Sequence, residues 1–244
     1  MNFHAWEWFL AVVGALLVGV AKTGITGLSL LFVSIFAAIM PARRSTGVVL
    51  PLLILGDVVA FLSYRRHAQW RHVWRLFPWA AAGVVAGAFA IGHMDERQTR
   101  LAIGGIVVAL TVLHLVRRAR PGVPGEERAA WFAPLIGMLA GFTTIVSNAA
   151  GPLMVIYLLA MRLPKMEYMG TGAVFFLMLN LFKAPFMIAL GLITPGSLML
   201  NLVLAPAVIA GTFFGRWLLG RINQRIFENI ALALTLFAGV RMFL

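Results

Sequence analysis

Two long hydrophobic stretches of this chain are each interrupted by a short polar segment that contains glycine. The first interruption, residues 22–27, reads Lys-Thr-Gly-Ile-Thr-Gly and lies within the apolar stretch 6–40. The second, residues 147–152, reads Ser-Asn-Ala-Ala-Gly-Pro and lies within 131–161. Irregular backbone survives inside a membrane only where protein or a water-filled cavity satisfies its polar groups. A polar break that occurs twice therefore predicts a binding site at membrane depth.

The composition indicates that these stretches lie in a lipid bilayer. Hydrophobic residues make up 61% of the chain and charged residues 11%, whereas soluble domains carry about 25% charged residues. We therefore expect an all-α polytopic membrane protein. The net charge of +12 sits mainly in short connections between apolar runs, as topological signals do, so nucleic-acid binding is not expected. The chain has no cysteine, which excludes disulfides and cysteine-ligated metals, and it shows no cofactor motif.

Eight hydrophobic units can be distinguished along the chain. The arms of the two broken units are short for a full crossing of about 20 residues, so we expect half-helices or tilted short helices there. The first unit lacks the basic start and the cleavage site of a signal peptide, which predicts a retained helix. The units are 6–40 (broken), 48–64, 74–93, 101–116, 131–161 (broken), 168–188, 197–218 and 227–243.

The charges of the loops predict how the units cross the membrane. Loops 65–75, 117–128 and 219–225 are rich in arginine and should be cytoplasmic, whereas 93–100 is balanced and 189–197 is uncharged. This places the protein in the cell inner membrane as a multi-pass chain. Each broken unit then starts and ends on one side of the membrane, and the two units enter from opposite sides. Arg43 and Arg44 disagree, because they fall on the predicted outside.

Residues of the first half recur in the second half at a nearly constant offset of 122–124 positions (141 − 19 = 122; 211 − 87 = 124). With the opposite orientations, this predicts two inverted repeats, a plan found in secondary transporters that bind substrate near the midplane. The predicted domains are an N-terminal repeat 1–118, a cytoplasmic linker 119–130 and a C-terminal repeat 131–244. The recurring residues are Gly19 with Gly141, Pro41 with Pro164, Asp57 with Asn180, and 86–89 with 210–213.

Three charged residues lie inside apolar runs. A charge at the centre of a membrane helix costs about 2.5–3.5 kcal/mol on insertion scales, so such residues are candidates for function. Lys22 opens the first break, and Lys183 lies three residues after Asn180 on the same helix face. Asp57 is the carboxylate deepest in an apolar run and is our candidate for proton coupling. Alternatively, the lysines snorkel to an interface and Asp57 forms a structural ion pair.

The breaks themselves offer hydrogen-bond donors suited to an anion. Their side chains supply hydroxyls and an amide, and backbone N–H groups at the start of a half-helix favour negative charge. Alternatively, the same residues serve only for capping and close helix packing. With the two lysines, these groups predict a site for a small oxyanion. The candidate substrate-binding residues are Lys22, Thr23, Gly24, Thr26, Gly27, Ser147, Asn148, Gly151, Asn180 and Lys183.

Over nearly its whole length the sequence resembles the TauE/SafE family of sulfite exporters and anion permeases. The resemblance implies transport of sulfite, thiosulfate or a sulfonate without ATP hydrolysis, and it implies that the polar positions of the breaks line the site. Many members carry a longer glycine run at both breaks than this chain does. The resembling stretches are GVAKTGITGLSLL (19–31), MPARRSTGVVLPLLILGDVVAFLSYRRHAQW (40–70), GFTTIVSNAAGPLMVIYLLAMRLPKMEYMGTGAVFFLMLNLFKAPF (141–186) and LGLITPGSL (190–198).

Together these features predict a secondary transporter that moves a small sulfur-containing anion by alternating access, with possible proton coupling. The alternatives are an anion channel and a carrier for a non-sulfur anion. An enzyme is not expected, because no acid–histidine or serine–histidine constellation occurs at membrane depth. We expect no cofactor and no metal, and a homodimer is possible.

Overall fold

The computed structural model describes residues 4–24, 28–90 and 129–241, together with the single positions 105, 108 and 112. The described part is helical throughout and shows no strand, and five of its helices are long and apolar enough to cross a membrane. The prediction of an all-α membrane protein is therefore confirmed. The predicted unit 101–116 and linker 119–130 lie almost entirely outside the described residues. The helices are α1 (Ala5–Thr23), α2 (Ser29–Ile39), α3 (Ala42–Tyr64), the 3₁₀ turn η1 (Arg65–His67), α4 (Trp70–Ala90), α6 (Ala129–Ser147), α7 (Ala150–Ala160), α8 (Lys165–Ala189), α9 (Pro195–Arg221) and α10 (Gln224–Arg241).

Each broken unit folds back on itself as a helical hairpin, α1 with α2 and α6 with α7. In the second hairpin the Phe132 and Tyr157 rings stack with centroids 5.9 Å apart, although the two residues lie far on either side of the break. In the first, the backbone of Gly14 on α1 packs against the ring of Phe36 on α2. The arms of both hairpins therefore run antiparallel, and Gly24 of the first break and Asn148 of the second lie at their tips.

The first arm of each hairpin is longer than the sequence predicted. Helices α1 and α6 each have 19 residues, about 28 Å at 1.5 Å per residue, whereas α2 and α7 have 11 each. The helices continue into the first polar residues of the breaks and end at Thr23 and Ser147. Ser147 Oγ donates to the Thr143 carbonyl of its own helix, whereas the Thr23 hydroxyl is shared between the Gly19 carbonyl of its own helix and the nearer Thr212 carbonyl of α9. The expectation of half-helices thus fits only the second arms.

Helices α3 and α8 lie between the hairpins and run antiparallel. Gly47, near the start of α3, packs against the backbone of Leu192, just beyond the end of α8. Gly170, near the start of α8, packs against the backbone of Tyr64 at the end of α3. Both helices begin after a proline, Pro41 or Pro164, whose fixed backbone suits the entry to a helix.

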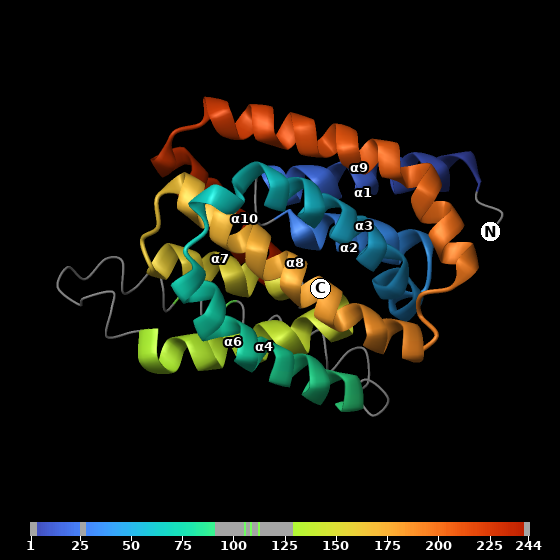
Figure 1. Ribbon diagram of the computed structural model, residues 1–244. Helices are drawn as coiled ribbons and strands as arrows, with labels where there is room; N and C mark the ends of the chain where they lie inside the picture. The colour runs from blue at the N-terminus through green and yellow to red at the C-terminus, as the bar shows by residue number, and fades with distance from the viewer. Residues whose placement is uncertain are drawn as a thin grey trace.

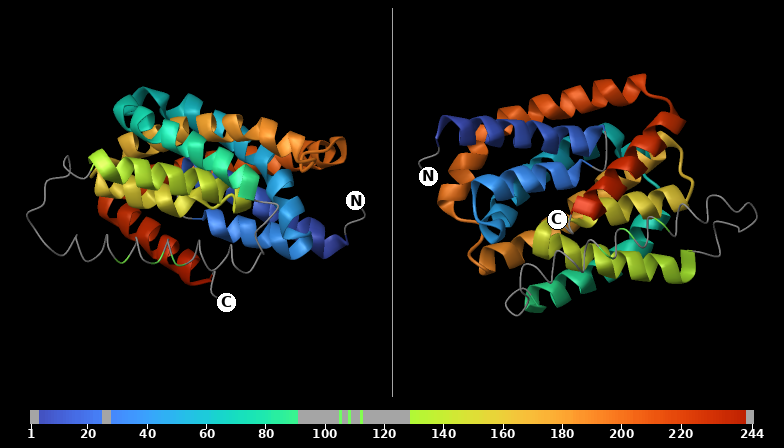
Figure 2. Two further views of the ribbon diagram at one scale, coloured as in Figure 1. Left: turned by 90° about the horizontal axis from the view of Figure 1, so that it is seen from below. Right: turned by 180° about the vertical axis from the view of Figure 1, so that it is seen from behind.

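Two close helix pairs flank this centre, α1 with α9 and α4 with α6 (Figures 1 and 2). Gly19 lies against the backbone of α9 at Val208 and Thr212. Gly141, which the predicted repeat matches to Gly19, lies against the backbone of α4 at Ala80. A side chain at either glycine would meet the neighbouring backbone, so small residues here let the helices approach closely.

Large apolar side chains also cover the outer surface of the bundle, most clearly on α9. Leu202 and Phe213 are 69% and 63% exposed, whereas α7 is almost entirely buried inside. A surface with so many exposed apolar side chains suits lipid rather than water. The described helices therefore form a membrane protein whose polar groups are concentrated inside.

Candidate functional site

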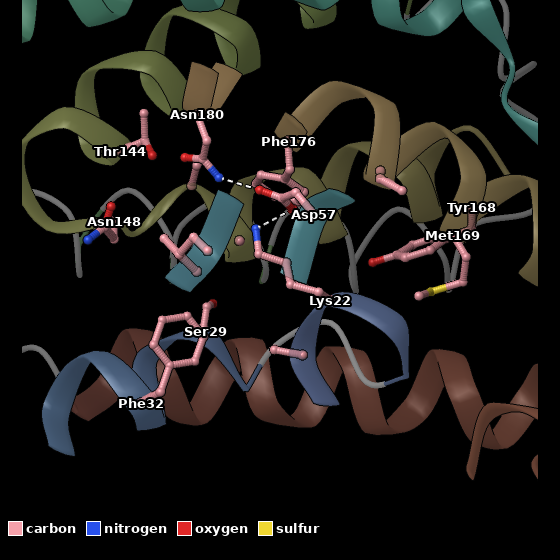
Figure 3. A pocket seen from close by; sticks show the side chains of 16 residues that line it. Lys22, Ser29, Phe32, Asp57, Thr144, Asn148, Tyr168, Met169, Phe176 and Asn180 are labelled. Carbon is pink, nitrogen blue, oxygen red and sulfur yellow. Dashed lines mark hydrogen bonds and ion pairs between the residues drawn. The ribbon is translucent and has the colours of Figure 1, made fainter. Parts of the chain in front are cut away.

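A small cavity lies between the two hairpins and the central pair of helices (Figure 3). Its walls come from α1, α2 and α3 of the first half and from α6, α7 and α8 of the second. Its volume is ≈ 50 Å³, which is room for roughly three to five water-sized positions. The cavity is therefore of the size of a small oxyanion.

The centre of the cavity wall holds a chain of three polar side chains, drawn with dashed lines in Figure 3. Lys22 Nζ lies 2.7 Å from Asp57 Oδ1, and Asn180 Nδ2 donates to Asp57 Oδ2 over 2.6 Å. Asp57 is fully buried, and the Lys22 side chain is 10% exposed. The Lys22 ammonium also lies 4.5 Å from the centroid of the Phe176 ring. Asp57 thus holds Lys22 through charge and is itself held by α8.

The second lysine is embedded in neutral oxygens. Lys183 is fully buried, and its Nζ donates to Asn148 Oδ1 at 2.6 Å, to Thr144 Oγ1 at 3.0 Å and to the Thr144 carbonyl at 3.2 Å. Asn148 turns the chain between α6 and α7 with φ of 54°, a left-handed conformation that asparagine tolerates better than most residues. Its Nδ2 donates to the Thr46 carbonyl of α3 over 3.1 Å.

These contacts place two lysines but only one carboxylate in and directly behind the cavity wall. Asp57 compensates Lys22, but no carboxylate in the described part of the chain lies within ion-pair distance of Lys183. A buried charge without a counter-ion is costly, and a bound anion would relieve that cost. Thr144 and Asn148, which contact Lys183, both line the cavity. The arrangement therefore suits a small anion bound beside them.

Some of the candidate residues from the sequence line the cavity, and others do not. Lys22, Asp57, Asn148, Gly151 and Asn180 line the cavity. Lys183 lies behind Thr144 and Asn148 rather than in the wall. Thr26 and Gly27 fall outside the described residues, so their place stays a prediction.

Three other candidates have packing contacts instead. Thr23 Oγ1 donates to the Thr212 carbonyl of α9 over 2.7 Å. Gly24 lies against the backbone of Gly215. Ser147 donates to the backbone of its own helix. None of the three lines the cavity, so their contacts match the alternative of capping and close packing.

Other residues that were not predicted from the sequence also line the cavity. Thr144 lies four positions before Asn148, one helical turn below the break, a spacing that could have identified it. Ser29 follows the first break, and its Oγ is buried without a hydrogen-bond partner among the described residues. Phe176 and Tyr168 line the cavity from α8, but apolar positions on a membrane helix gave no signal for them.

Comparison with known proteins identifies a family but no individual relative. No curated protein and no solved structure matches the chain. The family model "Sulfite exporter TauE/SafE" matches residues 10–242, nearly the whole chain, in agreement with the resemblance of the quoted stretches. Members of this family are membrane transporters for sulfite or related anions. The chain therefore belongs to the TauE/SafE sulfite exporter family.

Proposed function

We propose that the chain is a secondary transporter of the cell inner membrane that moves a small sulfur-containing anion, namely sulfite, thiosulfate or an organosulfonate. The observation that carries this proposal is the cavity between the two hairpin tips, which has Lys22 and Asp57 in its wall and the buried Lys183 directly behind Thr144 and Asn148. The family membership supports sulfur oxyanions as the substrate class. The anion would contact Lys22, Ser29, Thr144 and Asn148.

The proposed architecture is two inverted repeats. Three observations support it: the equal lengths of α1 and α6 and of α2 and α7, the antiparallel course of α3 and α8, and the equivalent glycine contacts. In addition, Asp57 and Asn180 are repeat counterparts and bond to each other. Two counterparts can touch only near the axis that relates them. Their contact would therefore mark the midplane, where inverted-repeat transporters hold substrate.

Asp57 is proposed to couple transport to protons. An anion that binds Lys22 competes with Asp57 for the same ammonium, because Lys22 Nζ already lies 2.7 Å from Asp57 Oδ1. Asp57 would then be a buried carboxylate without its cation, a state that costs several kcal/mol. Uptake of a proton by Asp57 removes that cost, so each anion would enter with a proton. Lys22 on α1, and Asn180 and Lys183 on α8, are the polar and charged groups around it.

Counterflow in proteoliposomes tests the proposal. Purified protein is reconstituted with unlabelled thiosulfate inside, and uptake of labelled thiosulfate is measured. A carrier gives saturable uptake that internal thiosulfate stimulates, and a channel gives unitary currents without such stimulation. Lys22→Met should abolish counterflow. Unchanged counterflow in a correctly inserted Lys22→Met protein would contradict the proposed site, and exchange of acetate but no sulfur anion would contradict the proposed substrate class.

A further inference from the structure

Helix α3 is tied at both ends to the tips of the two hairpins. At its last residue, Tyr64 OH donates to the Thr23 carbonyl at the tip of the first hairpin over 2.8 Å. In its first turns, the Thr46 carbonyl accepts from Asn148 Nδ2 at the tip of the second hairpin over 3.1 Å. Both contacts are buried. Each tip thus reaches a different end of the same helix.

The two contacts lie on opposite sides of the cavity. Thr46 and Tyr64 are 18 residues apart (64 − 46), about 27 Å along an α-helix, and Leu53 and Asp57, which line the cavity, fall between them. Figure 3 shows Asn148 at one end of the cavity and Tyr168 at the other. The Tyr168 end lies beside the end of α3, where Gly170 meets Tyr64. One contact therefore lies beyond each end of the cavity.

Each contact taken alone is a weak tie. Each is a single hydrogen bond between a neutral side chain and a backbone carbonyl, whereas the centre of α3 is held by an ion pair. Lys183 also orients the Asn148 side chain. Its Nζ donates to Asn148 Oδ1 over 2.6 Å, so that Asn148 Nδ2 faces the Thr46 carbonyl. Lys183 is thus a positioning residue for this contact.

We infer that these two hydrogen bonds are the gates of the site, Tyr64–Thr23 on the side of the arginine-rich residues 65–75 and Asn148–Thr46 on the other. Alternating access would open one while the other holds. This inference rests on the proposed transport function. It assigns to Tyr64 and Thr46, outside the cavity wall, a part in transport.

The natural absence of cysteine allows a direct test. A single Ser29→Cys substitution places a thiol in the cavity wall, and Ala173→Cys on α8 gives a second reporter. The rate at which a membrane-impermeant maleimide labels each thiol is measured from each side of sealed vesicles. Tyr64→Phe removes only the hydroxyl. Asn148→Gly removes the amide and keeps the left-handed turn, and Asn148→Asp serves if the glycine variant does not fold.

The inference requires opposite effects from the two gate variants. Tyr64→Phe should speed labelling only from the arginine-rich side, and Asn148→Gly only from the other side. Loss of one neutral hydrogen bond predicts an increase of roughly two- to tenfold. Unchanged rates for both reporters, or faster labelling from the same side in both variants, would overturn it. Labelling does not depend on transport, so a failure of thiosulfate counterflow with a side-specific labelling change would reject the proposed substrate and leave the gates standing.

Discussion

The two hairpin tips bring a lysine to the site in different ways. The first tip carries Lys22 itself into the cavity, where Asp57 compensates its charge. The second tip carries neutral Asn148, and Lys183 approaches it from α8 with hydrogen bonds to neutral oxygens only. Lys22 therefore has an internal counter-ion that a bound anion would have to displace, whereas Lys183 has no carboxylate within ion-pair distance among the described residues. In the proposed transporter, Lys22 and Asp57 would respond to anion binding, and Lys183 would favour the entry of an anion.

The largest expected difference between substitutions of the two lysines is in the free energy of unfolding. Lys22→Met leaves Asp57 buried without its cation, which should lower the free energy of unfolding by about 3–5 kcal/mol. The double variant Lys22→Met with Asp57→Asn removes both charges and should recover most of this loss. Denaturant unfolding in detergent micelles measures it. Equal stability of the single and double variants would show that the ion pair does not couple these residues.

A smaller loss is expected at the second lysine. Lys183→Met strands no carboxylate and leaves only Asn148 Oδ1 and the Thr144 oxygens without their donor. Its free energy of unfolding should fall by about 1–3 kcal/mol, less than in Lys22→Met. The same unfolding measurement compares the two directly. A loss at Lys183 as large as that at Lys22 would mean that the two lysines are compensated in the same way.

The proposed displacement of Asp57 from Lys22 by an anion predicts that anion binding depends on pH. If the complex holds one more proton than the free protein, mass action makes thiosulfate bind more tightly as the pH falls, by up to about tenfold per pH unit. Thiosulfate suits this test because its own charge is constant near neutral pH. Asp57→Asn should reduce this pH dependence to the part contributed by Lys183, the other buried titratable group beside Asp57. A pH dependence as steep in Asp57→Asn as in the wild type would assign the proton to another group.

The smallest effect should come from the hydroxyl beside the first tip. Ser29 Oγ has no partner among the described residues, so Ser29→Ala should leave the unfolding free energy unchanged. If Ser29 donates to the anion, the substitution weakens thiosulfate binding by roughly two- to tenfold. Fluorescence or calorimetric titration detects this. A stability change without any change in affinity would place Ser29 in the packing rather than in the site.

The sequence predicted much of this organisation, because the polar breaks and the constant repeat offset can be seen in the chain itself. The predicted units 48–64 and 168–188 correspond to α3 and α8, which begin earlier, directly after Pro41 and Pro164, and the matched residues Asp57 and Asn180 meet in the structure. The lengths of α1 and α6 were underestimated, because hydropathy cannot register a hydroxyl that bonds back to its own helix, as Ser147 does.

Side-chain direction limited the prediction of the site. Lys183 was predicted to bind substrate, and the structure places it directly behind the cavity wall. Whether a helical side chain reaches a cavity depends on the rotation of its helix, and the sequence does not contain that rotation. Ser29 and Phe176 enter the wall for the same reason. Their positions follow from how α2 and α8 pack, and an apolar sequence pattern does not determine which side of a helix faces the cavity.

Calorimetric titration of the purified protein tests the central claim most directly. Thiosulfate, sulfite and sulfoacetate are titrated, with acetate as the carboxylate control, into the wild-type protein and into Lys22→Met and Lys183→Met. The account predicts saturable binding of at least one sulfur anion to the wild type, at least tenfold tighter than acetate by about 1.4 kcal/mol, and loss of that binding in both lysine variants. Absence of binding to any sulfur anion, or undiminished binding in both variants, would contradict it.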